Sequence, residues 1–198
     1  MHYLSDCIAS FYVRKSIIPK DHKDIYSYGI ELILNEALTF ALVLLVSVIM
    51  HRFWDGILFL ITFCCTRIYT GGFHAKTVAV CRATMIITLI SVLDFTVIIE
   101  SVPLWILVLC LIGSAVILFP LIPVKHPNKT LTENQKRKGK VKGICTYIFF
   151  SGCSIILCEF NKRAGVLINL SLMSVTILAI VGKIRTREVK SGEQKVFR

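Results

Sequence analysis

Residues 30–50 read IELILNEALTFALVLLVSVIM, an apolar run interrupted near its start by Glu31, Asn35 and Glu36. About 20 predominantly apolar residues span the hydrocarbon core of a bilayer, so this run predicts a transmembrane helix. The whole chain is 55% hydrophobic with a mean hydropathy of +0.72, and 18% of its residues are charged. These values exclude an ordinary soluble domain and require the charges to be concentrated outside the apolar runs.

Further apolar windows predict an all-α polytopic membrane protein with about six transmembrane helices, of which the second and fifth are short. The six windows lie near 30–50, 54–70, 78–99, 103–123, 143–159 and 164–182. Residues 1–29 are too charged and too interrupted to supply the apolar centre of a signal peptide. We expect an N-terminal segment at 1–29, a membrane domain at 30–182 and a basic tail at 183–198.

The N-terminal segment contains an amphipathic pattern. Leu4, Ile8, Phe11 and Tyr12 recur at helical spacing, and Pro19 would end the helix. Such a helix suits the cytoplasmic membrane interface, with its apolar face toward lipid. A soluble helix packed on the protein's own loops is an equally good interpretation.

Basic residues predict the orientation. All of the 23 Lys and Arg residues except Arg52, Lys162 and Arg163 fall on one side of the six predicted spans. Because basic residues favour the cytoplasmic side, both termini and the segment at 67–82 are expected there. Topology and an anionic lipid bilayer explain the net charge of +11, and nucleic acid is not an expected partner. An RNA-binding loop at 124–142 is a weak alternative, because no aromatic residues accompany its charges.

The cysteines do not predict a disulfide framework or a metal site. Eight are present, mostly inside predicted spans and without regular spacing. Cys64, Cys65 and His74 lack the further ligand that a tetrahedral site needs. No metal or other cofactor is expected.

Residues 67–81, RIYTGGFHAKTVAVC, combine a basic residue, a Gly-Gly pair, a histidine and a cysteine between two predicted spans. A thiol attacks as the thiolate, which nearby cations and a helix N-terminus favour. Thr77 could cap a helix that holds Cys81 in its first turn, with Arg82, Lys76 and Arg67 adding positive charge. His74 could accept the thiol proton and return it to a leaving amine.

Geometry sets a condition on this pair. In one unbroken helix, His74 and Cys81 would be separated by about 10 Å, too far for proton transfer. The sequence therefore predicts that the helix holding Cys81 begins near Thr77, with Gly71 and Gly72 permitting the turn before it. Contact with a second subunit is the alternative. As isolated residue types, His74 fits a polar loop and Cys81 fits packing.

A third residue could orient the pair. Glu36 and Asn35 lie in the same half of the first span as this segment, and Glu36 is our candidate for holding His74 or a cation. A structural ion pair of Glu36 with Arg67 is the alternative. Arg67 itself could bind a substrate carboxylate or extend toward the interface.

The pattern R-x-x-x-G-G-x-H-A, followed by a cysteine seven residues after the histidine, resembles the accessory gene regulator B (AgrB) family of bacterial membrane endopeptidases. Arg67, Gly71, Gly72, His74 and Cys81 stand at the family's positions, and Ala75 does as well. Pro120, Pro123 and the run at 126–130 resemble the family's exit from the fourth span, although Thr130 stands where many members have proline.

The resemblance implies that Cys81 is the nucleophile and His74 its general base. The implied substrate is a precursor peptide of the AgrD type, whose C-terminal tail is removed. The acyl-enzyme thioester would then be captured by the precursor's own cysteine or serine, giving a thiolactone or lactone for quorum sensing. The resemblance also implies a homodimer in the bacterial cell membrane.

Substrate contacts are expected at the lysine-rich loop. The implied precursor has an amphipathic N-terminal helix and an acidic C-terminal tail, which basic residues could attract. These residues are Lys129, Lys136, Arg137, Lys138 and Lys140. Their role in topology alone is the simpler interpretation. A peptide transporter and a non-catalytic scaffold are the alternative functions, and both should tolerate the loss of Cys81.

Overall fold

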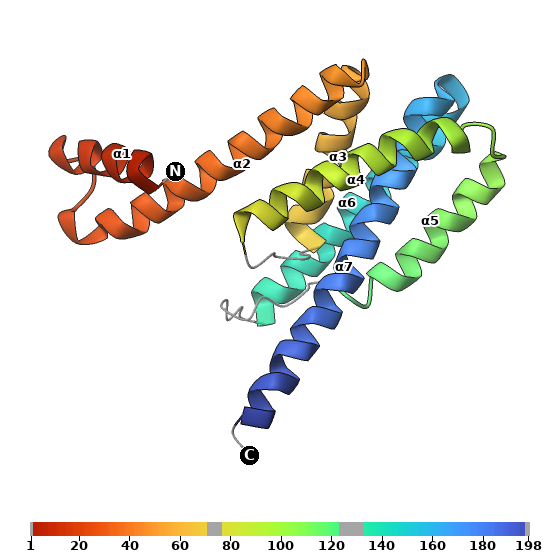
Figure 1. The fold of residues 1–198 in the computed structure, drawn as a ribbon. Helices are drawn as coiled ribbons and strands as arrows, with labels where there is room; N and C mark the ends of the chain where they lie inside the picture. Colours follow the sequence, from red (N-terminus) through yellow and green to blue (C-terminus); the bar gives the residue numbers. More distant parts are fainter. Residues whose placement is uncertain (1, 71–76, 123–132, 197–198) are drawn as a thin grey trace.

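The computed structural model describes residues 2–70, 77–122 and 133–196. The described chain forms seven α-helices and one short 3₁₀-helix (Figure 1). They are α1 (His2–Arg14), η1 (Lys20–His22), α2 (Lys23–Ile49), α3 (Phe53–Thr70), α4 (Val78–Ile99), α5 (Leu104–Leu118), α6 (Glu133–Phe160) and α7 (Lys162–Val196).

The helices confirm the predicted all-α polytopic membrane fold. Within the described residues, five helices are long and apolar enough to cross a membrane, and α5 is a shorter apolar helix. Their bounds differ from the predicted windows, because helical backbone continues past the apolar runs. Thus α2 already begins at Lys23, α6 begins at Glu133 and α7 continues to Val196, whereas α5 ends early, at Leu118.

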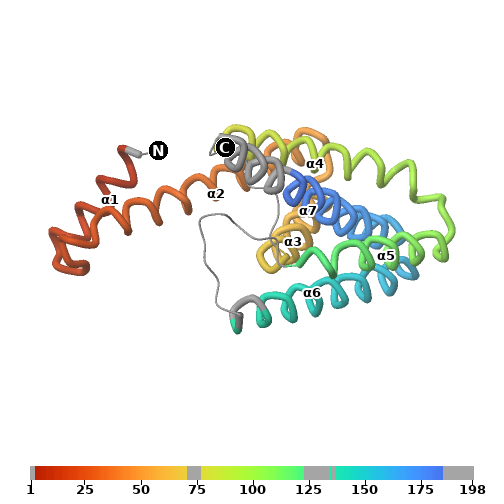
Figure 2. The backbone as a smooth tube through the Cα atoms, turned by 90° about the horizontal axis from the view of Figure 1, so that it is seen from below, coloured from red at the N-terminus to blue at the C-terminus, as the bar shows by residue number. Residues whose placement is uncertain are grey.

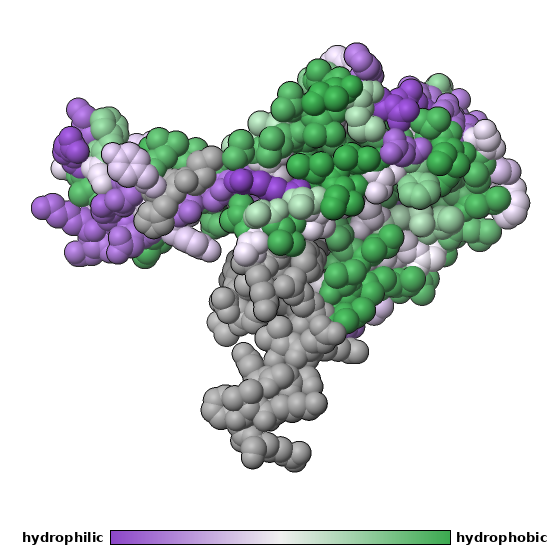
Figure 3. Space-filling model, viewed as in Figure 1, coloured by the Kyte–Doolittle hydropathy of each residue, from purple (hydrophilic) through white to green (hydrophobic). Residues whose placement is uncertain are grey.

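Helix α7 lies at the centre of the bundle, where it contacts α3, α4, α5 and α6 (Figure 2). In its apolar window 56% of the residues are buried, against 17% for α2. One core cluster includes Phe59, Phe63, Leu89 and Leu167, and a second includes Tyr147. Many other apolar side chains are exposed, and they form much of the described bundle surface seen in Figure 3, as a lipid-facing surface requires.

Polar side chains inside the bundle bond to backbone carbonyls. The Tyr147 hydroxyl donates to Leu111 O at 3.0 Å and also contacts Ser114, while Asn169 Nδ2 donates to Leu107 O at 3.0 Å. Both bonds tie the short helix α5 to α6 and α7. In hydrocarbon surroundings, such bonds avoid the cost of an unpaired polar group.

At one end of the bundle, basic side chains join neighbouring elements. Arg163 at the start of α7 pairs with Asp55 at the start of α3, and Arg52 Nη1 donates to Leu93 O of α4 at 2.6 Å. These are two of the three basic residues predicted to lie on the far side of the membrane. The structure therefore places them together at one end of the bundle.

The N-terminal helix is present as predicted. Helix α1 packs along the first half of α2, and this pair of helices extends away from the bundle as an arm (Figures 1 and 2). The contact uses small side chains, because Ser5 and Ala9 are fully buried while Leu4 and Phe11 are exposed. Leu4 and Phe11 of the predicted apolar face therefore do not pack on the chain, whereas Ile8 is half-buried.

Candidate active site

Helix α4 begins as the sequence predicts. Thr77 has extended backbone dihedrals, and its side chain accepts a hydrogen bond from the Val80 N–H at 3.4 Å, as an N-cap does. Cys81 lies at the end of the first turn, where its N–H donates to Thr77 O at 3.2 Å. The Cys81 thiol is free and half-buried. The cysteine thus lies near the partial positive charge of a capped helix N-terminus.

Arg82, the next residue of α4, is held by helix α2. Its Nη2 donates to Asn35 Oδ1 at 2.7 Å. Its Nε is buried and has no hydrogen-bond partner among the described residues. The structure therefore brings Asn35 to the cation beside Cys81, a role that the sequence did not predict.

Glu36 and Arg67 lie in the same neighbourhood, on α2 and α3. Both are close enough to the Cys64 thiol to act on it electrostatically. The Arg67 guanidinium also lies over the Phe63 ring, 5.4 Å from its centroid, in the last turn of α3. A cation at this point is favoured by the C-terminal end of the helix.

The start of α6 packs against the end of α3. The Lys142 ammonium lies 5.8 Å from the centroid of the Tyr69 ring. The next residue is Gly143, and a Cβ there would lie 3.4 Å from Tyr69 O and 3.3 Å from an Ile122 methyl group. Glycine therefore allows the close approach that brings the basic start of α6 to the end of α3. Arg137 and Lys138 are exposed on the same helix.

Several predicted site residues lie outside the described residues, namely Gly71, Gly72, His74 and Lys129. Lys136 belongs to α6, but its side chain is not described. Arg67 lies in the last turn of α3, and Cys81 and Arg82 lie near the start of α4, the two helices that flank residues 71–76; Glu36 lies within α2. Among the residues that the structure describes, no group of three His, Cys, Asp or Glu side chains could hold a metal ion.

Residues 5–182 match the family described as Accessory gene regulator B. The chain belongs to the AgrB family. Membership supports a role in the agr quorum-sensing system, consistent with the membrane fold.

Two similar relatives are AgrB-like proteins of Clostridium perfringens. The protein from strain SM101 (type A) is 26% identical over 195 residues, covering 89% of this chain and 90% of the relative. AgrB-like protein 2 from strain 13 (type A) is 27% identical over 147 residues, covering 69% of each chain. No solved structure matches the chain.

Proposed function

We propose that this AgrB-family member is a membrane-embedded cysteine endopeptidase that removes the C-terminal tail of an AgrD-like precursor and promotes thiolactone or lactone formation. The observation that carries this proposal is Cys81 in the first turn of α4, behind the Thr77 cap, in a chain of this family. A helix N-terminus favours the thiolate and supplies free N–H groups.

The proposed reaction has two acyl transfers. The Cys81 sulfur attacks the scissile carbonyl carbon while His74 accepts the thiol proton, and collapse of the tetrahedral intermediate breaks the C–N bond. His74 returns the proton to the leaving amine of the tail, and a thioester remains on Cys81. The precursor's own thiol or hydroxyl then attacks this thioester, loses its proton to His74 and regenerates the Cys81 thiol.

The first turn of α4 also offers donors for the oxyanion. The N–H of Val80 is used by the Thr77 side chain, and the N–H of Cys81 by the Thr77 carbonyl. By helix geometry, the N–H groups of Val78 and Ala79 have no intrahelical acceptor. We assign these two groups the role of stabilising the tetrahedral oxyanion.

Arg82 favours the negative sulfur in this scheme. Asn35 is neutral, so it fixes the guanidinium without cancelling its positive charge. A charge that is not cancelled acts strongly where the surroundings exclude water. Glu36 on α2 and Arg67 on α3 would serve as an ion pair or as contacts of His74 and the substrate.

The basic start of α6 would attract the acidic tail of the precursor. Arg137 and Lys138 are exposed there, and Lys142 lies beside Tyr69 at the end of α3. Lys129 and Lys136 belong to the same basic stretch of sequence. The proposal places both termini and this site on the cytoplasmic side, with the enzyme acting as a homodimer.

Co-expression with the cognate precursor tests the proposal. Mass spectrometry should find the native protein releasing the tail and forming a product that has lost water relative to the cleaved peptide. Cys81→Ala and His74→Ala should leave the precursor intact, whereas Cys145→Ala, which removes an exposed thiol from α6, should process it normally. Equal processing by Cys81→Ala and the native protein would contradict the proposal and favour a transporter or scaffold.

A further inference from the structure

A basic pocket lies at the elbow of the N-terminal arm, where α1 ends and α2 begins. It is lined by Ser10, Val13, Arg14, Ser16, Lys20 and Lys23, and its volume is about 590 Å³. The geometry points to a binding site for the phosphate headgroup of an anionic membrane lipid. This inference is independent of the proposed peptidase chemistry.

The charges of the pocket suit a phosphate group. Arg14, Lys20 and Lys23 supply three cations, and the pair of Lys23 with Asp6 at 3.2 Å removes only part of that charge. An ammonium group has three donors, so the bond to Asp6 leaves donors of Lys23 for a ligand. Ser10 and Ser16 add hydroxyl groups, which also donate to phosphate oxygens.

The backbone at the elbow favours an anion as well. The continuous helix Lys20–Ile49 starts at the elbow, and Pro19 at its N-cap position gives it no side-chain hydrogen bond. The N–H groups of His22 and Lys23 donate to Pro19 O and Lys20 O, but the positive dipole end of this 30-residue helix lies at the elbow. The C-terminal end of α1 carries the opposite, negative partial charge. Two of its carbonyl groups are already bonded, because Ser16 N donates to Val13 O and Ile17 N donates to Tyr12 O.

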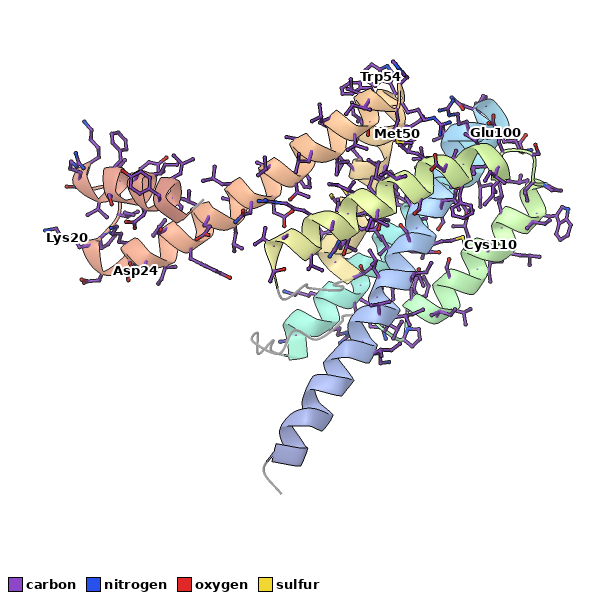
Figure 4. The ribbon with its side chains drawn as sticks, viewed as in Figure 1. Lys20, Asp24, Met50, Trp54, Glu100 and Cys110 are labelled. Atoms are coloured by element: carbon purple, nitrogen blue, oxygen red, sulfur yellow. The ribbon has the colours of Figure 1, made fainter. Side chains whose placement is uncertain are left out.

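The length of α2 brings the elbow to headgroup depth. The candidate span Lys20–Ile49 has 30 residues, which corresponds to about 45 Å of helix. The hydrocarbon core is only about 30 Å thick, so roughly 15 Å of the span extends beyond it, and less along the membrane normal when the helix tilts. Figure 4 shows Lys20 and Asp24 at this end of α2, with Met50 and Trp54 at the other end.

The surroundings of the pocket favour a lipid over a soluble phosphate. Ile17 and Ile25 are 63% and 69% exposed next to it in the sequence, and Phe11 is 52% exposed on α1. Because α1 uses Ser5 and Ala9 to pack on α2, these larger side chains remain available for acyl chains. Cations beside exposed apolar residues are the pattern of a helix lying at an anionic membrane surface.

Native mass spectrometry of the full-length protein in detergent tests this site. The probes are phosphatidylglycerol, phosphatidylcholine and inorganic phosphate, each added alone and in competition. The pocket variant is R14Q/K20Q. The matched control is K15Q/K162Q, which removes the same charge at an exposed arm residue outside the pocket and at the distant start of α7. Circular dichroism and size-exclusion chromatography confirm that each variant is folded and report its oligomeric state.

The native protein should retain phosphatidylglycerol more strongly than phosphatidylcholine. R14Q/K20Q should reduce that preference at least about tenfold, and K15Q/K162Q should leave it nearly unchanged. Equal losses in the two variants would overturn the site, because charge alone would then suffice. Displacement by equimolar inorganic phosphate would assign it to a soluble anion. Dissociation of a dimer by R14Q/K20Q with unchanged lipid preference would assign the elbow to a second copy of the chain.

Discussion

Gly56 at the start of α3 provides a quantitative test of the fold, because it lies directly against Ser47 of α2. Both residues are buried, and a Cβ on Gly56 would lie 2.5 Å from Ser47 Cβ and closer still to its hydroxyl. Ordinary contact begins near 3.4 Å, so Gly56→Ala requires α2 and α3 to separate by roughly 1 Å. Overpacking of this kind costs about 2–3 kcal/mol.

The double variant S47G/G56A should recover most of this loss, because it moves the missing Cβ to the other helix. Ser47→Gly alone should cost about 0.5 kcal/mol from its effect on helix propensity. Thermal unfolding in detergent can be followed by tryptophan fluorescence. The unfolding temperature of Gly56→Ala should be about 4–10 °C below that of the native protein. The double variant should unfold within a few degrees of Ser47→Gly. A Gly56→Ala protein as stable as the native one, or a double variant no better than Gly56→Ala, would refute the packing argument.

Three further changes probe the site and the helix ends. Asn35→Asp should cancel the positive charge of Arg82 and slow iodoacetamide labelling of Cys81 at neutral pH several-fold. Peptide mass spectrometry measures the labelling, and an unchanged rate would remove Arg82 from the mechanism. Lys142→Ala should raise the KM for the precursor and weaken its salt dependence, whereas Lys142→Arg should preserve both, since either cation can lie over Tyr69. His51→Gly should stabilise the protein by about 1 kcal/mol in thermal unfolding, because His51 follows the C-cap of α2 with a φ of 54°, which favours glycine. A lower unfolding temperature would contradict this reasoning.

Local signals allowed much of the fold and one end of the site to be predicted. The apolar windows identified the membrane helices, because their lengths match the bilayer. Thr77 identified the start of α4, because a threonine at an N-cap accepts a hydrogen bond from an N–H group of the first turn. The same cap placed Cys81 in the first turn before any tertiary contact was known.

The central position of α7 could not be predicted from hydropathy. The apolar windows of α2 and α7 have the same mean hydropathy, 2.3, yet α7 is far more buried. Lipid tails are as apolar as a protein core, so the composition of a span does not reveal which surface it contacts. Small and polar residues such as Asn169 and Ser171 inside α7 were the available signal.

The contact of Asn35 with Arg82 could not be predicted from the sequence either. The two residues are 47 positions apart, and the contact depends on how α2 crosses α4. Glu36, the predicted candidate, is the adjacent residue, so the sequence identified the correct turn of α2. A rotation of one residue about the helix axis, about 100°, separates the two choices.

Trapping the acyl-enzyme tests the central claim most directly. The native protein is mixed with a precursor whose cyclising residue is replaced by alanine, and the tryptic peptide 77–82, TVAVCR, is analysed by mass spectrometry. We predict that this peptide carries the precursor without its tail, that hydroxylamine releases it, and that Cys81→Ala forms no adduct. Tail removal by Cys81→Ala, or an adduct on another cysteine, would contradict the account.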